Sequence, residues 1–251
     1  MSTEYKRVIL VTGSNSGIGY ETVKILAKKG HIVYLAARNE VTGLEAQRKL
    51  QTEHGLNVKF VQLDVTDVKS IQAAKEKIEK EEGRLDVLFN NAGIAVMTKD
   101  QNATSIDVST VRELMETNFF GLVQTTVTFL PLLRKAAQQK PGYTVILMNT
   151  SDMASNGLQA SPRALPHLAA YNSSKAAVNS YTIALAQELK GEGIKVNCVT
   201  PGFTSTNLNG WLPGGKTVEQ PAPLMAEWCL LGPEDEGKTG LFWSDSGSFP
   251  W

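Results

Sequence analysis

Short apolar runs recur along the chain and are continuous rather than alternating between apolar and polar residues. Alternation is typical of strands with one solvated face, whereas continuous runs are typical of strands covered on both faces. The stretches between the runs have helical apolar spacing. This order predicts an α/β protein with a single doubly wound parallel sheet and helices on both faces. The runs are Val8 to Val11, Ile32 to Ala37, Val58 to Leu63, Leu85 to Phe89, Val145 to Met148 and Lys195 to Val199, and the expected helices are Tyr20 to Lys29, Glu40 to Glu53, Val68 to Glu82, Val108 to Leu133 and Leu168 to Lys190.

The composition indicates one globular domain. At 251 residues the chain can bury a sizeable core, and no linker or repeat divides it, so we expect a single domain over residues 1–251. Basic and acidic side chains balance at 25 each, which argues against nucleic acid or an anionic membrane as a partner. Because the start Met1 to Lys6 is polar and no long apolar run follows, we expect no signal peptide and no membrane span. Cys198 and Cys229 lie in apolar segments, which favours a reducing compartment, the cytoplasm.

A glycine-rich turn connects the first apolar run to the first helix. Such a turn lets the backbone approach a pyrophosphate and aims free amides and the positive helix end at it. The glycine spacing differs from the common dinucleotide fingerprint, and an ordinary tight turn is the alternative. Its place after a buried strand favours a dinucleotide site. The candidate cofactor-binding residues of the turn are Gly13, Ser14, Asn15, Ser16, Gly17, Ile18 and Gly19.

Tyr171 and Lys175 are four residues apart in an expected helix, so their side chains lie on one face. A free phenol has a pKa of about 10, and a nearby fixed positive charge favours the phenolate and lowers that pKa. The pair can therefore make a general acid. The alternative is an ordinary helix surface with a half-buried tyrosine and a lysine that reaches solvent.

These motifs, in this order, resemble the classical short-chain dehydrogenase/reductase family, and within it the carbonyl reductase-like branch. The resemblance covers roughly residues 6 to 205. It implies reversible hydride transfer between a nicotinamide cofactor and a carbonyl or alcohol. Besides the glycine turn and the tyrosine–lysine pair, the matching motifs are Asn90-Asn91-Ala92-Gly93, a serine after the fifth strand, and Pro201-Gly202.

The resemblance implies four catalytic residues. Tyr171 would donate a proton to the substrate oxygen, and Lys175 would lower the pKa of Tyr171 and hold the nicotinamide ribose. Ser151 would donate a second hydrogen bond to the developing oxyanion. Asn118, in the helix before the fifth strand, would hold a water that links Lys175 to solvent; a capping or helix-bending asparagine is the other interpretation.

The position of the serine and the segment after it need separate arguments. Thr150 and Ser155 also flank the end of the fifth strand, and the alignment of that strand favours Ser151. The gap from Ser151 to Tyr171 is longer than usual in the family, so residues 156–168 are expected to form an insertion near the active site. Similar insertions mark the often monomeric carbonyl reductase branch, which favours a monomer, with a homo-oligomer as the alternative.

NADP is favoured over NAD as the cofactor. An NAD enzyme would carry an acidic residue at the end of the second strand, where Ala37 offers no carboxylate to repel a 2′-phosphate. Arg38 can bind that phosphate, although Glu40 could instead neutralise it. The resemblance adds the remaining cofactor-binding candidates, which are Asp64 and Val65 near the adenine, Asn91, Ala92 and Gly93 along the adenosine ribose, and Pro201, Gly202 and Thr206 near the carboxamide or a phosphate.

The substrate pocket is expected from loops beyond the carboxyl ends of the strands. These are residues 94–97, the insertion at 156–168 and a lid at 203–228. No anchor for a carboxylate or phosphate is evident, so a hydrophobic or aromatic ketone or aldehyde is the expected substrate. Phe203, Trp211 and Trp228 are the candidate binding residues, with simple packing of the lid as the alternative. We expect no metal site.

Two other classes of protein remain open. One is a non-catalytic dinucleotide sensor on the same fold, against which the complete set of Ser151, Tyr171 and Lys175 argues. The other is a sugar-nucleotide epimerase or dehydratase with the same tyrosine–lysine pair. That class has a different glycine spacing and usually a longer substrate domain after the position of Thr206.

Overall fold

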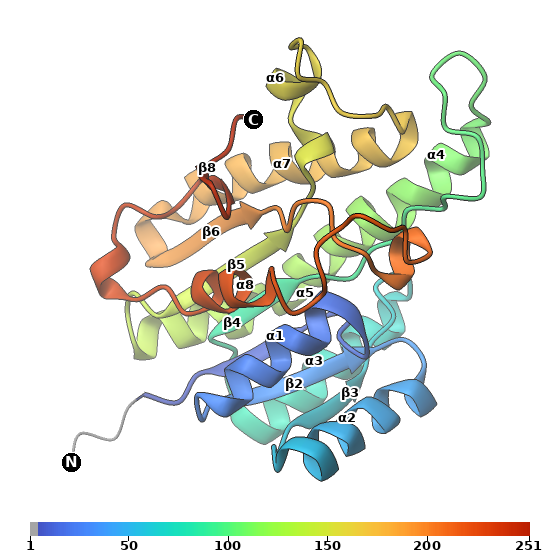
Figure 1. The fold of residues 1–251 in the computed structure, drawn as a ribbon. Coiled ribbons are helices and arrows are strands. Elements are labelled where there is room, and N and C mark those ends of the chain that lie inside the picture. The colour runs from blue at the N-terminus through green and yellow to red at the C-terminus, as the bar shows by residue number, and fades with distance from the viewer. Residues whose placement is uncertain (1–4) are drawn as a thin grey trace.

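The computed structural model describes residues 5–251, and an eight-stranded sheet forms its centre (Figure 1). The strands are β1 Val8–Val11, β2 Ile32–Ala37, β3 Lys59–Gln62, β4 Val87–Asn90, β5 Thr144–Asn149, β6 Ile194–Val199, β7 Phe242–Ser244 and β8 Gly247–Ser248. They lie in the order β3-β2-β1-β4-β5-β6-β7-β8, and all neighbours are parallel except the last pair. The predicted doubly wound sheet is confirmed, with one antiparallel strand at its edge.

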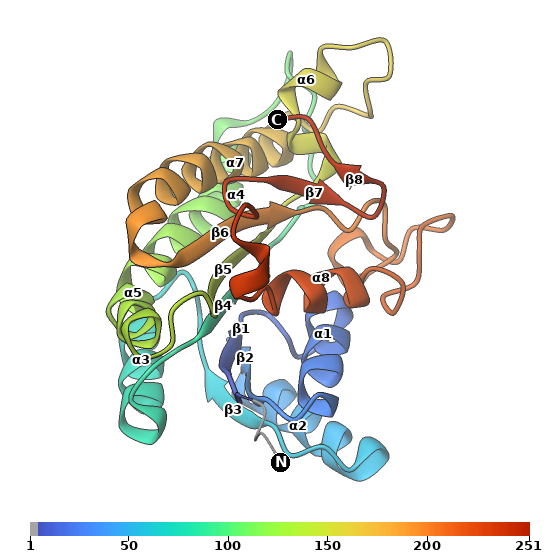
Figure 2. The same cartoon turned by 90° about the vertical axis from the view of Figure 1, so that its left-hand side faces the viewer.

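Helices cover both faces of this sheet. They are α1 Gly17–Lys28, α2 Glu40–His54, α3 Val68–Glu82, α4 Val108–Met115, α5 Gly121–Gln139, α6 Asn156–Gln159, α7 Ala169–Leu189 and α8 Ala222–Cys229. Figure 2 shows α1, α2 and α8 on one side of the sheet and α3, α5 and α7 on the other. The structure therefore has three layers, with the sheet between two layers of helices.

The continuous apolar runs supply two separate cores. Along β1, Val8 and Leu10 pack into the cluster under α3, α5 and α7, whereas Ile9 and Val11 pack into the cluster under α1, α2 and α8. Successive side chains of a strand point to opposite faces, so a strand buried on both faces must be apolar at every position. This two-sided burial is the physical reason for the pattern seen in the sequence.

The helix expected over Val108 to Leu133 is interrupted. After α4 ends at Met115, a π-helical turn covers Glu116–Phe120 before α5 begins at Gly121. A single π turn adds one residue to the local hydrogen-bonded ring and leaves the apolar stripe readable on both sides, so the apolar spacing did not predict it. Asn118 lies in this turn.

Two expected loops also differ in detail. The insertion at 156–168 begins with the short helix α6, where the N–H of Gly157 donates to the carbonyl of Trp251 at 2.9 Å. The lid expected over 203–228 ends earlier, because α8 begins at Ala222 and packs against α1 and the sheet. The exposed part of the lid is therefore residues 203–220.

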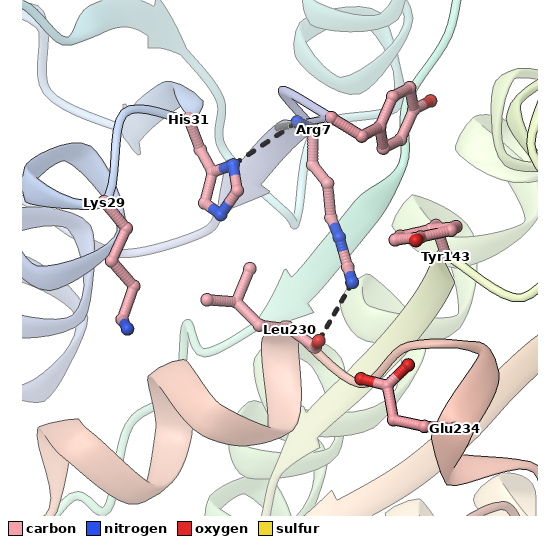
Figure 3. A pocket seen from close by; sticks show the side chains of 7 residues that line it. Arg7, Lys29, His31, Tyr143, Leu230 and Glu234 are labelled. Carbon is pink, nitrogen blue, oxygen red and sulfur yellow. Dashed lines mark hydrogen bonds between the residues drawn. The ribbon is translucent and has the colours of Figure 1, made fainter. Parts of the chain in front are cut away.

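Arg7 lies just before β1, at the edge of the sheet where the strands begin (the amino edge), and connects this edge to α8. Its buried guanidinium donates to the carbonyls of Leu231 at 2.8 Å, Leu230 at 2.9 Å and Cys229 at 3.3 Å, at the end of α8. The same guanidinium lies 4.9 Å from the centroid of the Tyr143 ring. Because Arg7 bonds to the end of α8, we assign the hollow beside it a structural role. That hollow of about 440 Å³ is lined by Tyr5, Arg7, Lys29, His31, Tyr143, Leu230 and Glu234 (Figure 3).

Within residues 5–251, none of the helices combines the length and the apolar character needed to span a bilayer. The expectation about the polar start concerns Met1 to Lys6, of which residues 1–4 lie outside the described part of the chain.

We predict that Arg7→Leu lowers the free energy of unfolding by more than about 2 kcal/mol, because three carbonyls at the end of α8 lose their charged donor. Urea denaturation followed by circular dichroism measures the change. Arg134→Leu is the matched control, since its pair with Glu192 is largely exposed and is worth about 1 kcal/mol or less. Equal losses in the two variants would contradict this role of Arg7.

Candidate active site

The turns after β1 and β4 are joined by side-chain hydrogen bonds. Thr12 Oγ1 accepts from the backbone N–H groups of Asn91 and Ala92, both at 3.0 Å. Asn91 Nδ2 donates to the carbonyls of Thr12 and Gly13 at 2.9 and 3.0 Å. Two predicted cofactor motifs that are far apart in the sequence therefore form one connected surface at the carboxyl edge of the sheet.

The glycines of the first turn are required for space and for backbone conformation. A Cβ on Gly13 would lie 2.8 Å from Ala92 Cα, and a Cβ on Gly19 would lie 2.4 Å from Asn91 Nδ2. Gly17 instead has a φ of +64°, and no heavy atom lies within 4 Å of where its Cβ would be. The turn is thus packed against the β4 turn and open at Gly17, where α1 begins without an acidic side chain in its first turn. An open turn at a positive helix end fits the phosphates of a dinucleotide.

Some side chains of the glycine turn serve the fold instead. Ser14 Oγ donates to the carbonyl of Val11 at 2.7 Å and accepts from the N–H of Ala36 at 3.0 Å, so it joins β1 to β2. Ile18 is buried in the core beside α1. These two residues can offer a ligand only their backbone. The side chains that remain at or near the surface are those of Asn15 and Ser16.

Helix α7 carries Tyr171 and Lys175 on one face, and both side chains are nearly buried, with 9% and 4% of their surface exposed. Lys175 Nζ donates to the carbonyl of Asn149, the last residue of β5, at 2.9 Å. The hydroxyl of Ser151, two residues further along the chain, lowers the pKa of the Tyr171 phenol. The structure therefore brings the predicted serine, tyrosine and lysine together.

Burial dominates the protonation of both α7 groups. It raises the pKa of Tyr171 from 10.0 to about 12, with a lowering by Ser151 and a raising by the charge of Asp152 as smaller effects. Burial also lowers the pKa of Lys175 from 10.5 to about 8. Lys175 is not among the groups that shift the pKa of Tyr171, so the lowering expected from it is not seen. Tyr171 keeps its proton at neutral pH, and Lys175 changes its charge near pH 8.

Ser151 is less committed to other protein groups than its two neighbours. Ser155 is fully buried, and its Oγ accepts a backbone N–H at 3.0 Å. Thr150 Oγ1 donates to Asn179 Oδ1 at 2.8 Å. The contact of Ser151 Oγ with the N–H of Met153 is longer, at 3.3 Å. The geometry therefore agrees with the choice of Ser151 as the candidate hydroxyl.

Asn118 is completely buried and connects three segments of the site. Its Oδ1 accepts from the N–H of Ile94 at 2.9 Å, while its Nδ2 donates to the carbonyl of Ile94 at 2.9 Å and to Ser174 Oγ at 3.0 Å. A Cβ on Gly93 would lie 3.2 Å from Asn118 Oδ1 and 3.3 Å from Lys175 Nζ. The side chain is thus a link between segments, and π turns of this kind are frequent at functional sites. Its role in a water relay stays a prediction.

Asn149 is a site residue that the sequence pattern did not predict. Its Nδ2 donates to Asn91 Oδ1 at 3.0 Å. Asn91 Nδ2 already donates to two carbonyls, which fixes the orientation of both amides. Asn149 Oδ1 is consequently a buried acceptor without a hydrogen-bond partner among the described residues. The signal that could have revealed it is an asparagine that ends an apolar strand beside the candidate serine.

The loops after β2 and β3 lie on the side of β1 that is away from β4 and β5. Arg38 is exposed, and the ion pairs found among residues 5–251 involve neither Arg38 nor Glu40. Asp64 Oδ1 accepts from the N–H and Oγ1 of Thr66 at 2.9 and 2.7 Å. Val65 is buried, and a Cβ on Gly121 would lie 2.6 Å from the carbonyl oxygen of Val65. Neutralisation of Arg38 by Glu40 is therefore not seen.

A small apolar cluster surrounds Tyr171. Its buried members are Ala95, Leu114, Ala170 and Tyr171, and Ile94, Val96, Ile106, Val111, Met153 and Leu168 are partly buried against them. Residues 94–97 and the end of the insertion were expected near the substrate, and both contribute to this cluster. Met153 is an addition that the sequence did not predict.

The three aromatic candidates of the lid have different surroundings. Phe203 and Trp211 are exposed, and Trp211 has a φ of +59°. Trp228 is only 1% exposed and packs on Trp243 with a ring-centroid distance of 5.1 Å, inside the core under α8. The prediction for Trp228 is therefore corrected: it is a core residue because α8 turns its indole toward the sheet.

The segment after β6 returns to the same edge of the sheet. Gly202 has a φ of +69°, and the carbonyl of Pro201 accepts from Lys216 Nζ at 3.0 Å. Lys216 also pairs with Asp245 at 2.5 Å and so fixes the lid to the β7–β8 turn. Thr206 donates its backbone N–H to Asn209 Oδ1 at 3.0 Å. Contacts of Pro201, Gly202 and Thr206 with a cofactor remain predictions.

Comparisons with known proteins agree with this geometry. The family model described as short chain dehydrogenase matches residues 7–213. The chain is 34% identical over 279 residues to carbonyl reductase (NADPH) 1 of Mus musculus, which covers 97% of this chain and 98% of that protein.

Solved structures give the same fold. The NADPH-bound carbonyl reductase from chicken fatty liver superposes with a TM-score of 0.85 and 28% identity, covering 98% of this chain and 99% of that one. The 3-ketoacyl-(acyl-carrier-protein) reductase from Brucella melitensis, complexed with NADH, superposes with a TM-score of 0.81 and 26% identity, covering 95% and 96%.

We predict that Lys175→Met is more stable than the parent protein at pH 7, by on the order of 2–3 kcal/mol, because the buried ammonium is costly. Between about pH 8 and pH 10 the unfolded chain binds a proton that the folded parent has lost. The free energy of unfolding of the parent therefore rises with pH in this window, and the difference from the variant shrinks. Urea denaturation at several pH values measures it.

The exposed Lys190→Met is the control, for which no such trend is expected. A difference between Lys175→Met and the parent that does not change from pH 7 to pH 10 would show that burial does not depress the pKa of Lys175.

Proposed function

The chain belongs to the short-chain dehydrogenase/reductase family, in its classical carbonyl reductase-like branch, and we propose that it reduces a hydrophobic ketone or aldehyde to the alcohol with NADPH. The observation that carries the proposal is the cluster of Ser151, Tyr171 and Lys175 beside the open glycine turn. The insertion at 156–168 supports a monomer, and two cysteines in apolar segments support the cytoplasm.

Tyr171 is the proton donor in this proposal. When bound, the reduced nicotinamide supplies a hydride to the carbonyl carbon, which leaves negative charge on the oxygen. Tyr171 gives its phenolic proton to that oxygen and becomes a phenolate. The phenolate then takes up a proton from solvent. A pKa of about 12 keeps this proton in place at neutral pH. A positioned general acid contributes about 10²–10⁴-fold in rate.

Ser151 and Lys175 support the transfer from two sides. The Ser151 hydroxyl donates to the developing oxyanion, a kind of contact worth about 3 kcal/mol. Lys175 donates one N–H to the carbonyl of Asn149, and its other two N–H groups can donate to ribose hydroxyls. Because Lys175 is not among the groups that shift the pKa of Tyr171, its proposed role is to hold the ribose.

The preference for NADPH rests on the loop after β2. Ala37 carries no carboxylate, and Arg38 is exposed and free of ion pairs with the described acidic residues. An arginine can hold a 2′-phosphate through two charge-assisted hydrogen bonds. The names of the mouse and chicken relatives include NADPH, whereas the Brucella structure holds NADH, so the loop itself carries the argument.

The class of substrate follows from the surroundings of the acid. Ile94, Val96, Met153 and Leu168 pack around Tyr171 and carry no charge. Burying apolar surface contributes about 25 cal/mol per Å², so this wall favours an apolar substituent on the carbonyl. Phe203 and Trp211, exposed on the lid, complete the proposed binding surface.

We predict that Tyr171→Phe lowers kcat for ketone reduction by about 10²–10⁴-fold, because the phenolic proton is lost while the ring is kept. NADPH absorbance with a panel of hydrophobic ketones, quinones and aldehydes measures turnover. NADPH binding, followed by fluorescence, should stay within about twofold of the parent. Full turnover of the variant would refute the mechanism, and NADPH binding without turnover of any carbonyl by the parent would favour the dinucleotide sensor.

We predict that Arg38→Asp shifts the cofactor preference from NADPH toward NADH by about 10²-fold or more in kcat/KM, since a carboxylate repels the 2′-phosphate and accepts from the ribose hydroxyls. The exposed Arg48→Asp on α2 tests for a general effect of charge. An unchanged NADPH-to-NADH ratio in Arg38→Asp would remove Arg38 from the phosphate site.

A further inference from the structure

The helix that carries Tyr171 begins without a capping residue of its own. The first N–H groups of any α-helix lack acceptors within the helix. A Ser, Thr, Asp or Asn just before the helix usually supplies an acceptor through its side chain. The residue before α7 is Leu168, which makes no side-chain cap, and the first turn contains no acidic residue. Its free N–H groups must therefore be satisfied from elsewhere.

Gln101 supplies these partners from a distant loop. Its Oε1 accepts from the N–H of Tyr171 at 3.1 Å, across 70 residues of sequence. Its backbone carbonyl accepts from the N–H of Ala169 at 2.9 Å. The side chain is 3% exposed, so these bonds are shielded from water. Figure 1 shows the loop between β4 and α4 reaching the start of α7.

The other end of the same amide holds the loop after β4. Gln101 Nε2 donates to the carbonyl of Ala95 at 2.7 Å and to the carbonyl of Val96 at 3.3 Å. Val96 has a φ of +49°, an unfavourable conformation for a β-branched residue. Such a conformation persists only where neighbouring contacts hold it, and Gln101 provides two of them.

Gln101 therefore ties the proposed acid to the proposed substrate wall. Ala95 and Tyr171 are buried in one cluster, with Val96 packed against it. The preceding residue, Ile94, is bonded through both its N–H and its carbonyl to Asn118. The loop is thus held by one amide at Ile94 and by another at Ala95 and Val96.

We propose that Gln101 is a positioning residue, which fixes the Tyr171 phenol relative to the wall formed by residues 94–96. This inference rests on the proposed reductase function. Gln101 acts through the first turn of α7 and does not touch the substrate. A displacement of about 1 Å can cost about 10²-fold in rate, so loss of this link should lower kcat more than it changes cofactor binding.

The position requires a group that both donates and accepts. A methionine donates no hydrogen bond and accepts only weakly, and a carboxylate only accepts. A protonated glutamic acid does both, as the amide does. Burial raises the pKa of a carboxyl group, so Gln101→Glu should recover function as the pH falls, whereas Gln101→Met should not.

The experiment compares Gln101→Met and Gln101→Glu with the parent from pH 5 to pH 8. We expect Gln101→Met to lower kcat by about 10–100-fold with NADPH affinity within about twofold of the parent. For Gln101→Glu we expect the ratio of its kcat to that of the parent to rise by about fivefold or more toward pH 5. Gln47→Met, which removes a single 2.8 Å bond from Gln47 to the carbonyl of Val58 far from the site, is the matched control.

Hydrogen exchange of the Ala169 and Tyr171 amides gives a readout that does not depend on turnover. The Tyr171 amide loses its side-chain acceptor and should exchange at least about tenfold faster in Gln101→Met, while it keeps the rate of the parent in Gln47→Met. The Ala169 amide keeps its backbone acceptor in both variants and serves as the internal reference. Unchanged exchange, a kcat equal to that of the control, or a pH-independent deficit of Gln101→Glu would overturn the role of Gln101. Absence of carbonyl reduction by the parent would instead overturn the proposed function, whatever the exchange rates.

Discussion

The central strands of the sheet are covered on both faces and are mostly apolar, so most polar side chains of the site gather where strands begin and end. At the amino edge the polar groups bond to one another: Asp86 accepts from Tyr5 and from the N–H of Val8, and Arg7 caps α8. At the carboxyl edge the groups are less completely satisfied. Lys175 uses one N–H of three, and Asn149 Oδ1 has no partner among the described residues. The first edge therefore holds elements of the fold together, and the second carries the polar groups that we propose contact the cofactor.

Much of this arrangement follows from the sequence, because two-sided burial leaves a continuous apolar signal and parallel strands bring their carboxyl ends together. The proximity of Tyr171 and Lys175 was predictable from their four-residue spacing on a helix, and Ser151 from the resemblance to the family; their catalytic roles stay predictions. The π turn at Asn118 was not, because the apolar stripe continues across it. Trp228 was misplaced, since the pattern of a lid and the pattern of a buried helix both contain aromatic residues. Gln101 carries no local signal, because its partners lie in other segments of the chain.

Burial sets the cost of the site as well as its chemistry. The same loss of solvent that raises the pKa of Tyr171 to about 12 lowers that of Lys175 to about 8. Both shifts favour the neutral forms, so the folded protein holds a proton donor and a cation that is easily neutralised next to each other. Keeping these groups away from water lowers the stability of the fold, as expected for the catalytic groups that we propose them to be.

Such a site must be held in place without adding charge to it. A further carboxylate near Lys175 would raise the pKa of the lysine, and a further cation would lower it. Carboxamides avoid this because they donate and accept while remaining neutral. Asn91 joins the β1 and β4 turns, Asn149 joins β5 to Asn91, Asn118 joins the π turn to Ile94, and Gln101 joins the β4 loop to α7. Neutral amides thus supply these four connections around the candidate site, and two N–H groups of Lys175 remain for the proposed cofactor.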